Sequence, residues 1–459
     1  MTAAAPARTA ASAPSITAEL ARRAASLRYD DIPEEIRTLA RQCLLDWLAV
    51  TLAGSREELA RILIAEAEEQ GGAASVTLIG HPRKAPTQQA ALVNGAASHA
   101  LDFDDVNMTM GGHPTVPIVP AILALAEARG ASGAQLVAAF VTGYETLCRV
   151  GALVSPGHYL RGFHNTATVG SFGAAAAAAH ILGLDAAKTA TALGIAGTQA
   201  AGLKSMFGTM CKPLHAGKAA QNGLIAASLA ARGFTSRDDV LECAQGFADT
   251  QSPDFRPEKA LADPPGGWHL RNNLFKYHAA CYLTHAPIEC ARELRRKHAI
   301  EPQAVRAVTL RVDAGASKVC HILAPRTGLE AKFSLRLTTA LALAGIDTAS
   351  LETYSERYAG DPALVALRDK VTVDFQREWK HTVAELAVAL ADGRVLEARH
   401  DSGVPASDLD AQGRRLEAKF MSLAKPVLGG AQAERLAGAV AELDALRSVA
   451  ELTRLCIPC

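Results

Sequence analysis

Residues 166–182 read TATVGSFGAAAAAAHIL, and this stretch shows what kind of fold the chain forms. Its apolar residues have helical spacing, and Gly183, directly after it, is a typical helix end. Six consecutive alanines give the helix flat faces, and such faces let neighbouring helix axes approach closely. The stretch therefore predicts a helix within a compact bundle of many helices.

The same helical spacing continues on both sides of this stretch. Apolar residues recur every three or four positions through most of the first half, and glycines such as Gly130 and Gly233 end the runs. We expect helices at residues 16–27, 33–52, 87–99, 117–127, 133–153, 166–182, 186–199 and 217–231. The spacing returns at residues 407–428 and 431–455, so we expect the C-terminal end of the chain to pack back on the first domain.

A different pattern follows the turn cluster PPGG at residues 264–267. Apolar and polar residues alternate at 305–312 and 371–375, and residues 384–390 and 395–398 flank an Asp-Gly pair typical of a hairpin. Helical spacing at 284–298 and 335–344 is interleaved with these strands. We therefore predict a mainly α fold. Its large all-helical domain is formed by both chain ends, residues 1–267 and 401–459, with an inserted smaller α+β domain at residues 268–400.

Composition narrows the class of protein. A chain of 459 residues is long enough for two or three domains. The 47 basic and 47 acidic side chains cancel, which argues against nucleic acid or an anionic membrane as a partner. No export signal is evident in residues 1–14, and the apolar stretches fall short of the roughly 20 residues of a membrane span. We expect a soluble, cytoplasmic protein.

The number and positions of the cysteines also fit a cytoplasmic protein. The nine cysteines are scattered and odd in number, so a disulfide framework is not expected. Cys456 and Cys459 form the one C-x-x-C pair, and no second pair or nearby histidine completes a metal site. We expect free thiols there and no bound metal.

The densest polar cluster is NGAASHALDFDDVNMTMGGHP at residues 94–114. Three carboxylates in four residues precede His113, which follows two glycines and is fixed by a proline, so the segment is expected to form a functional loop. The carboxylates could bind Mg²⁺, or Asp102 could orient a histidine and make it a better base. Alternatively, Asp104 and Asp105 could cap the loop or the next helix.

Three further segments carry candidate groups. In GFHNTATVG, residues 162–170, His164 stands at a helix start that favours an anion, with Thr166 or Thr168 as the cap and His158 a weaker candidate. In GTMCKPLHAG, residues 208–217, Lys212 precedes a proline and is expected in a loop, as a carboxylate-binding cation or a surface residue, with His215 beside it. Residues 276–285, KYHAACYLTH, open the second domain and contain His285, which could be structural.

These residues together suggest a pocket for a small, multiply charged anion, with groups that move protons. No dinucleotide-binding, phosphate-loop or zinc pattern is present, so we expect the chemistry to need no cofactor.

The four blocks at 94–114, 162–184, 204–233 and 276–291 together resemble the MmgE/PrpD family, which includes 2-methylcitrate dehydratases, cis-aconitate decarboxylases and an iminodisuccinate epimerase. The resemblance implies a helical domain with a smaller α+β domain, homodimers and a cofactor-free site between the domains. It places the family's site residues on Asp102, His113, His164 and Lys212. Cys281 and Val106 stand where the decarboxylase branch has a histidine and a hydroxyl residue.

The reactions of this family share a proton transfer at carbon next to a carboxylate. We expect a cofactor-independent lyase of the dehydratase or decarboxylase type, acting on a small di- or tricarboxylate. His113 and His164 would exchange the proton, and Asp102 would orient one of them. Lys212, His215, Cys281, His285 and the helix start near Thr166 would hold the substrate. An epimerase of an amino- or imino-dicarboxylate and a non-catalytic carboxylate-binding protein remain alternatives.

Overall fold

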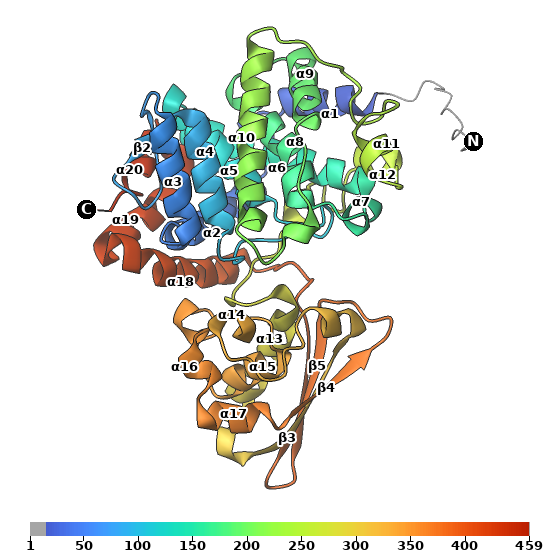
Figure 1. Cartoon of the computed structure of the whole chain (residues 1–459), viewed down its shortest axis with the longest axis vertical. Helices are drawn as coiled ribbons and strands as arrows, with labels where there is room; N and C mark the ends of the chain where they lie inside the picture. The colour runs from blue at the N-terminus through green and yellow to red at the C-terminus, as the bar shows by residue number, and fades with distance from the viewer. Residues whose placement is uncertain (1–14, 459) are drawn as a thin grey trace. The chain divides into compact units, whose positions relative to one another are not determined.

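The computed structural model describes residues 15–458 and divides into two compact units (Figure 1). The helical unit contains the chain up to Asn273 and again from Asp408 onward, and the α+β unit is Leu274–Ser407. The divisions expected from the sequence were at residues 267 and 400. Residues 1–14 and Cys459 lie outside the described residues, as do the expectations made for them; Cys456 is buried and its thiol is free.

The helical unit is built almost entirely of helices. They are α1 (Ile16–Ser26), α2 (Glu34–Gly54), α3 (Glu58–Gln70), α4 (Thr87–His99), α5 (Thr115–Arg129), α6 (Gly133–Val154), α7 (Gly157–Leu160), α8 (Asn165–Ile181), α9 (Ala186–Gly197), α10 (Cys211–Ala231), α11 (Phe247–Gln251), α12 (Pro257–Leu261), α18 (Leu409–Leu428), α19 (Gly430–Ala441) and α20 (Ala450–Arg454). Two short strands, β1 (Val76–Thr77) and β2 (Lys84–Ala85), pair antiparallel beside them. The predicted mainly α fold, formed from both chain ends with an inserted α+β part, is confirmed.

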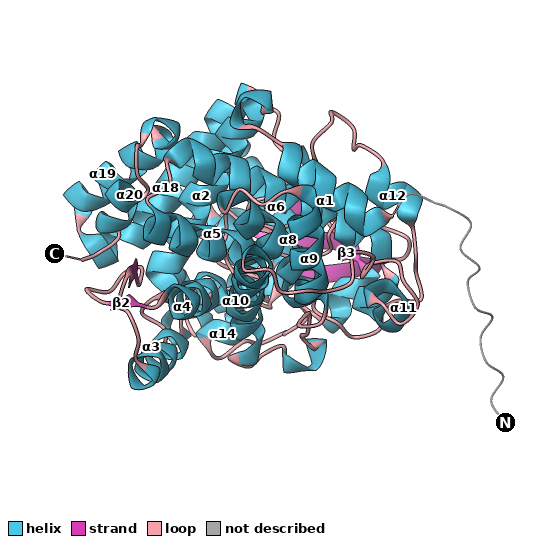
Figure 2. Cartoon of the chain, turned by 90° about the horizontal axis from the view of Figure 1, so that it is seen from above, coloured by secondary structure: helices cyan, strands magenta, loops and turns pink. Residues whose placement is uncertain are grey.

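The alanine-rich helix α8 lies in the core of this unit. All its residues from Asn165 to Ala179 are buried, and it contacts α5, α6, α9 and α10, which surround it in Figure 2. A Cβ atom on Gly223 of α10 would lie 2.5 Å from the backbone nitrogen of Ala175. The helices are therefore closer together than a larger side chain would permit, as the small residues predicted.

Helix α6 is long and apolar enough to cross a membrane by length and composition alone. Its length exceeds what the apolar stretches of the sequence predicted. In the structure, 94% of its most apolar window is buried inside the unit. Within the described part of the chain it is therefore a core helix, and its apolar surface is used for packing.

The C-terminal helices pack back on the N-terminal ones, as the sequence predicted. Helix α18 contacts α2 (Figure 1), and its Lys419 reaches into the core. There the ammonium group lies 2.6 Å from Oδ1 of Asp46 and 2.7 Å from the carbonyl oxygen of Phe103. Both charged side chains are buried. The end of the chain thus holds the backbone of the loop that follows α4.

The α+β unit contains a four-stranded sheet with helices packed on it. Its elements are α13 (His285–His298), α14 (Gly328–Ala331), α15 (Leu335–Leu343), α16 (Glu356–Ala359), α17 (Pro362–Arg368), β3 (Val305–Asp313), β4 (Val371–Gln376), β5 (Val383–Leu390) and β6 (Val395–Asp401). The strand order is β4-β3-β5-β6, with β3 and β4 parallel and the other pairs antiparallel. The predicted hairpin is β5–β6, and its turn contains Gly393 at a positive φ of 90°.

Candidate active site

The loop between α4 and α5 carries most of the candidate groups. His99 is the last residue of α4, and Pro114 is the N-cap of α5. The carboxyl group of Asp105 accepts a hydrogen bond from the Thr115 hydroxyl at 2.5 Å, so it ties the loop to the first turn of α5, as one interpretation of the sequence proposed. Asp102 has a left-handed backbone with φ of 50°, which is uncommon for a residue other than glycine.

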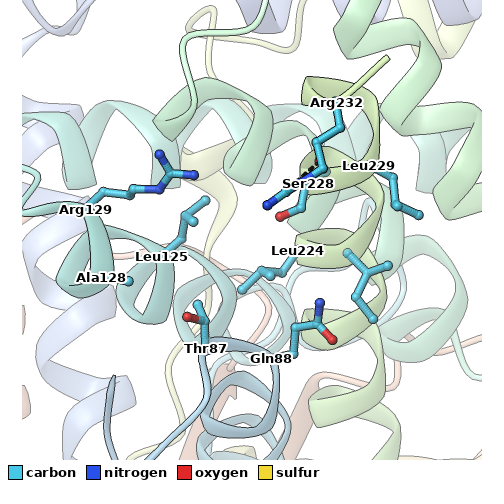
Figure 3. Close-up of a pocket in the computed structure, with 10 residues that line it drawn as sticks. Thr87, Gln88, Leu125, Ala128, Arg129, Leu224, Ser228, Leu229 and Arg232 are labelled. Atoms are coloured by element: carbon cyan, nitrogen blue, oxygen red, sulfur yellow. Dashed lines mark hydrogen bonds between the residues drawn. The ribbon is translucent and has the colours of Figure 1, made fainter. Parts of the chain in front are cut away.

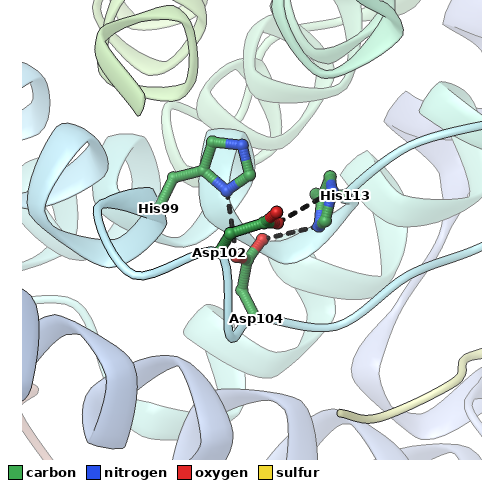
Figure 4. Close-up of side chains that lie close together, drawn as sticks. All are labelled: His99, Asp102, Asp104 and His113. Atoms are coloured by element: carbon green, nitrogen blue, oxygen red, sulfur yellow. Dashed lines mark hydrogen bonds and ion pairs between the residues drawn. The ribbon is translucent and has the colours of Figure 1, made fainter. Parts of the chain in front are cut away.

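Asp104 lies between two imidazole rings (Figure 4). Its Oδ1 is 2.9 Å from Nδ1 of His99, and its Oδ2 is 2.9 Å from Nδ1 of His113. The two ring centroids are 4.6 Å apart. Asp104 therefore does not cap a helix, which was one alternative. Its Oδ1 is hydrogen-bonded to the His99 ring, and its Oδ2 lies beside the His113 ring without a hydrogen bond.

The position of the His113 ring fixes which nitrogen is free to act. Nδ1 lies 2.9 Å from the carbonyl oxygen of Asp105, and a carbonyl oxygen only accepts hydrogen bonds, so Nδ1 carries the proton. In the neutral ring Nε2 then has the free lone pair. Nε2 lies 3.7 Å from Oδ1 of Asp102. The basic atom of His113 thus faces Asp102.

The same carboxylate holds the candidate cation. Nζ of Lys212 lies 3.0 Å from Oδ2 of Asp102. The side chain of Asp102 is 39% exposed, whereas those of Lys212 and His113 are only 15% and 13% exposed. Asp102 is therefore the solvent-facing member of a group whose cation and imidazole lie further in.

Two sequence expectations about these residues are corrected. Lys212 is in the first turn of α10, not in a loop, because a proline at Pro213 is tolerated where backbone N–H groups have no partner in the helix. The carboxylate beside Nδ1 of His113 is Asp104 and not Asp102, which pairs with Lys212 and contacts His113 only at Nε2.

A second pair of imidazoles adjoins the first. Nδ1 of His164 lies 3.0 Å from Nδ1 of His215, so one ring donates to the other. The His164 ring stacks on that of His99 at a centroid distance of 5.9 Å. Phe207 contacts both the His164 ring, at 5.0 Å, and the Lys212 ammonium, at 5.6 Å from the ring centroid. All these groups belong to the helical unit.

Thr166 has a different role from the one expected. His164, not Thr166 or Thr168, is the N-cap of α8, and no side chain caps that helix. The Thr166 hydroxyl is buried and accepts a hydrogen bond from the backbone N–H of His113 at 3.1 Å. It therefore positions His113. The weaker candidate His158 is buried and bonds to Thr168 at 2.7 Å, which is a structural arrangement.

The two remaining candidates lie in the α+β unit. His285 is buried, and its Nε2 lies 3.1 Å from the carbonyl oxygen of His278. Cys281 is partly buried against the core of that unit. Their expected contact with substrate stays a prediction.

The protonation states follow from burial and neighbouring charge. Burial lowers the pKa of His99 to about 4, although Asp104 opposes this shift. Burial also lowers the pKa of His164 well below its usual value, with a smaller effect from His99. Burial alone would raise the pKa of Asp104, but His113 and His99 hold it well below its usual range. The cluster thus contains a buried carboxylate anion and two neutral imidazoles near neutral pH.

His99 and Asp104 were missed as site residues in the sequence analysis. Both stand in the quoted stretch 94–114, but nothing in their spacing shows that a carboxylate five positions after a helix-ending histidine folds back onto it. The left-handed backbone at Asp102 makes this turn. An aspartate at that position is compatible with a left-handed residue, which is a weak sequence signal.

The cluster also has the composition of a metal site. Among the described residues, His99, Asp102, Asp104 and His113 are the set whose ligand-type atoms lie within 4.8 Å of one another (Figure 4). A divalent cation there would have to compete with the Lys212 ammonium for Asp102 and with the Nδ1 proton of His99 for Oδ1 of Asp104. The Lys212 ammonium already neutralises Asp102, whereas Nε2 of His99 and Oδ2 of Asp104 are buried without a hydrogen-bond partner, so the side chains of the set do not occupy all of its ligand-type atoms themselves.

The fold and the cluster define a class: a mainly helical protein of two units whose helical unit gathers imidazoles, carboxylates and a lysine. Residues 18–260 match the MmgE/PrpD N-terminal domain and residues 278–445 match the MmgE/PrpD C-terminal domain. The chain belongs to the MmgE/PrpD family. The C-terminal match extends through the whole of α18 and α19, which the structure assigns to the helical unit.

The relatives of this chain are named for the decarboxylation of cis-aconitate. The chain is 32% identical over 302 residues to the cis-aconitate decarboxylase-like protein oryM of Aspergillus oryzae, and 30% identical over 297 residues to cis-aconitate decarboxylase of Aspergillus terreus. These matches cover 62% of this chain and only 62% and 61% of the respective relatives. Cis-aconitate decarboxylase of Homo sapiens is 28% identical over 460 residues, covering 96% of this chain and 94% of that protein.

Proposed function

We propose that this protein is a lyase that moves a proton at carbon adjacent to a carboxylate of a small di- or tricarboxylate. The observation that carries the proposal is the position of Asp102, 3.0 Å from the Lys212 ammonium and 3.7 Å from Nε2 of His113. The Lys212 cation and the basic nitrogen of His113 therefore lie on either side of the Asp102 carboxylate. A substrate carboxylate bound to Lys212 in place of Asp102 would present its neighbouring carbon to His113.

The charges of the cluster suit the proton transfer. When Nε2 of His113 takes a proton from carbon, the ring becomes an imidazolium beside the Asp104 carboxylate, 2.9 Å from Nδ1. The electron pair of the broken C–H bond moves onto the substrate carboxylate, whose added negative charge faces Lys212. Both developing charges thus meet an opposite charge that is present before the reaction, so little reorganisation is needed.

The substrate class is supported by the relatives and by Lys212. The relatives are named for cis-aconitate, a tricarboxylate. A hydroxy acid of this class can lose a proton and then hydroxide from the neighbouring carbon, which forms an alkene and water. An unsaturated acid such as cis-aconitate can instead lose carbon dioxide, and the carbanion that remains takes up a proton. We place this chain in the dehydratase or decarboxylase group and propose that its own side chains suffice, without a metal or an organic cofactor.

An epimerase is the second candidate, and one feature favours it. The cluster holds two imidazole systems, His113 with Asp104 and His164 with His215. Two such systems could take a proton from one face of a carbon and return it to the other, which is what epimerisation of an amino- or imino-dicarboxylate requires. A carboxylate-binding protein without turnover is the remaining alternative.

One assay separates these functions. The purified protein would be incubated in D₂O with citrate, cis-aconitate, 2-methylcitrate and iminodisuccinate in turn, and followed by proton NMR. A dehydratase converts a hydroxy acid into an alkene and water, or the reverse, and a decarboxylase releases carbon dioxide and leaves a smaller unsaturated acid. An epimerase exchanges the α-hydrogen for deuterium without forming an alkene. Saturable binding across the panel with neither change would overturn both catalytic proposals and leave the binding protein.

The assembly and location also stay proposals. The family resemblance implies a homodimer, and the composition suggests the cytoplasm. Light scattering on the purified chain and fractionation of the source cells would test the two.

A further inference from the structure

A pocket lies in the helical unit at the far ends of the helices that carry the cluster. It has a volume of about 310 Å³ and lies where the start of α4, the end of α5 and the end of α10 meet (Figure 3). Helix α4 contributes Thr87 and Gln88, α5 contributes Leu125 and Arg129, and α10 contributes Leu224 and neighbouring residues. Small-molecule sites in proteins begin at about this size.

The pocket carries uncompensated positive charge. Arg129 and Arg232 extend toward each other from α5 and from the end of α10 (Figure 3). In the described part of the chain, no acidic residue lines the pocket, and Arg129 has no hydrogen bond or ion pair. Arg232 donates only to the carbonyl oxygen of Ser228, one turn earlier. The nearby Glu127 is already engaged by Thr77 and Lys84.

Two guanidinium groups that face each other without a carboxylate repel, so an anion placed between them would be stabilised by both. The rest of the wall combines the polar, uncharged side chains of Thr87, Gln88 and Ser228 with apolar ones. Leu125 and Leu224 form part of it and are themselves buried, while Ile225 and Leu229 are only partly covered. The pocket therefore has one end that would bind an acidic group and an apolar surface next to it.

We propose that this pocket binds a small amphipathic organic anion, with the acid group between Arg129 and Arg232 and the apolar part on Leu125 and Leu224. It is a separate site from the catalytic cluster. Lys212 is at the start of α10 and Ser228 is sixteen residues later on the same helix, which at about 1.5 Å per residue is about 24 Å away. His99 likewise ends α4, whereas Thr87 begins it.

The test uses hexanoate as the probe, with hexyl phosphate as the second acid and hexylamine as the matched cation. Binding to the full chain is measured by isothermal titration calorimetry. The double variant Arg129→Met/Arg232→Met removes both charges of the pocket. Arg435→Met is the control and changes an exposed arginine of α19. Lys212→Met removes the cation of the catalytic cluster. Both pocket arginines are exposed, so the double variant is expected to fold.

We expect saturable binding of an acid probe to the wild type, to Arg435→Met and to Lys212→Met. In the double variant, the affinity should fall by at least about tenfold, since charge-assisted hydrogen bonds are lost. The tighter of the two acid probes identifies the acid group. Equal binding of hexylamine, undiminished binding to the double variant, or no binding of either acid would overturn the proposal.

Two other outcomes would overturn the proposed anion site and assign the observed effect to another part of the protein. If binding disappears in Lys212→Met, the probe occupied the catalytic cluster and not this pocket. If the acids do not bind and the double variant changes its oligomeric state in sedimentation, the arginines serve a contact between copies of the chain. The lyase assay is independent of both measurements, so failure of the proposed function leaves this inference standing.

Discussion

Oδ2 of Asp104 lies 2.9 Å from Nδ1 of His113. Because His113 and His99 keep the pKa of this buried carboxyl well below its usual range, the group is an anion at neutral pH. In the proposed reaction it would stabilise the positive charge that His113 gains on taking a proton, in the way that a buried aspartate supports the histidine of a hydrolase triad.

Replacing Asp104 with asparagine should lower kcat by at least about a hundredfold on a substrate identified by the NMR assay, with a smaller change in KM. The reason is that the amide keeps the shape of the side chain and loses its charge. Thermal unfolding of the same preparation checks that the variant is folded. Unchanged kcat in a folded variant would contradict the role given to Asp104.

Lys212→Met should lower kcat/KM by at least about a hundredfold, because the variant loses the fixed cation that faces the substrate carboxylate. Lys218→Met is the matched control: this lysine is exposed on the same helix and bonds to Gln221, outside the cluster. We expect its kinetics to stay within about twofold of the wild type. Equal losses in the two variants would show that a general effect on α10, and not the cation, is responsible.

Asp105 makes stability depend on pH. Burial raises its pKa to about 8, with contributions from Asp46 and Asp104 and opposed by the hydrogen bond from Thr115. The native protein therefore keeps a proton that the unfolded chain releases near pH 4. Between about pH 4 and pH 8 the unfolded state binds fewer protons, so the free energy of unfolding falls as pH rises.

Asp105→Asn should remove this contribution. We expect the fall in Tm from pH 5 to pH 8 to be smaller in the variant than in the wild type. Burial also raises the pKa of Glu145, to about 7, but that group is present in both proteins and cancels in the difference. Parallel Tm profiles would mean that Asp105 is ionised in the native protein.

The buried pair of Lys419 and Asp46, which supports the loop that carries the candidate groups, predicts a stability loss. Lys419→Met leaves Asp46 buried without this cation, which should lower the free energy of unfolding by about 3–5 kcal/mol in urea denaturation. Asp46→Asn/Lys419→Met removes both charges and should recover part of the loss. A single variant that loses under about 1 kcal/mol would show that water reaches the pair.

Gly217 of α10 lies against the backbone of α4. A Cβ there would be 2.2 Å from the carbonyl oxygen of Leu92, so Gly217→Ala must push apart the helices that carry His99 and Lys212. We expect a loss of about 1–3 kcal/mol in the free energy of unfolding, together with reduced activity.

Gly438→Ala is the control for this change. Gly438 is inside α19, and a Cβ there meets nothing within 4 Å, so the variant should gain about 0.4–1 kcal/mol by the higher helix propensity of alanine. A Gly217→Ala protein as stable as this control would contradict the close approach of α4 and α10.

Much of the architecture follows from local pattern. The helices around residues 166–182 and the hairpin at Asp392-Gly393 were predictable because apolar period and turn chemistry act over a few residues. The start of α10 was not, because Pro213 indicates a break in the chain but is equally acceptable in a first helical turn. Local signals allow both interpretations, and packing selects one.

For the site, the sequence by itself determined the inventory: His113, His164, Lys212 and a run of aspartates in a loop, with the family pattern that relates them. Only the tertiary structure decided which side chains each aspartate contacts. Asp102 turns toward Lys212 because its backbone is left-handed, and Asp104 thereby comes to lie between His99 and His113. Contacts between α4, its loop and α10 set these distances, and residues so far apart in the chain leave no local pattern that encodes them.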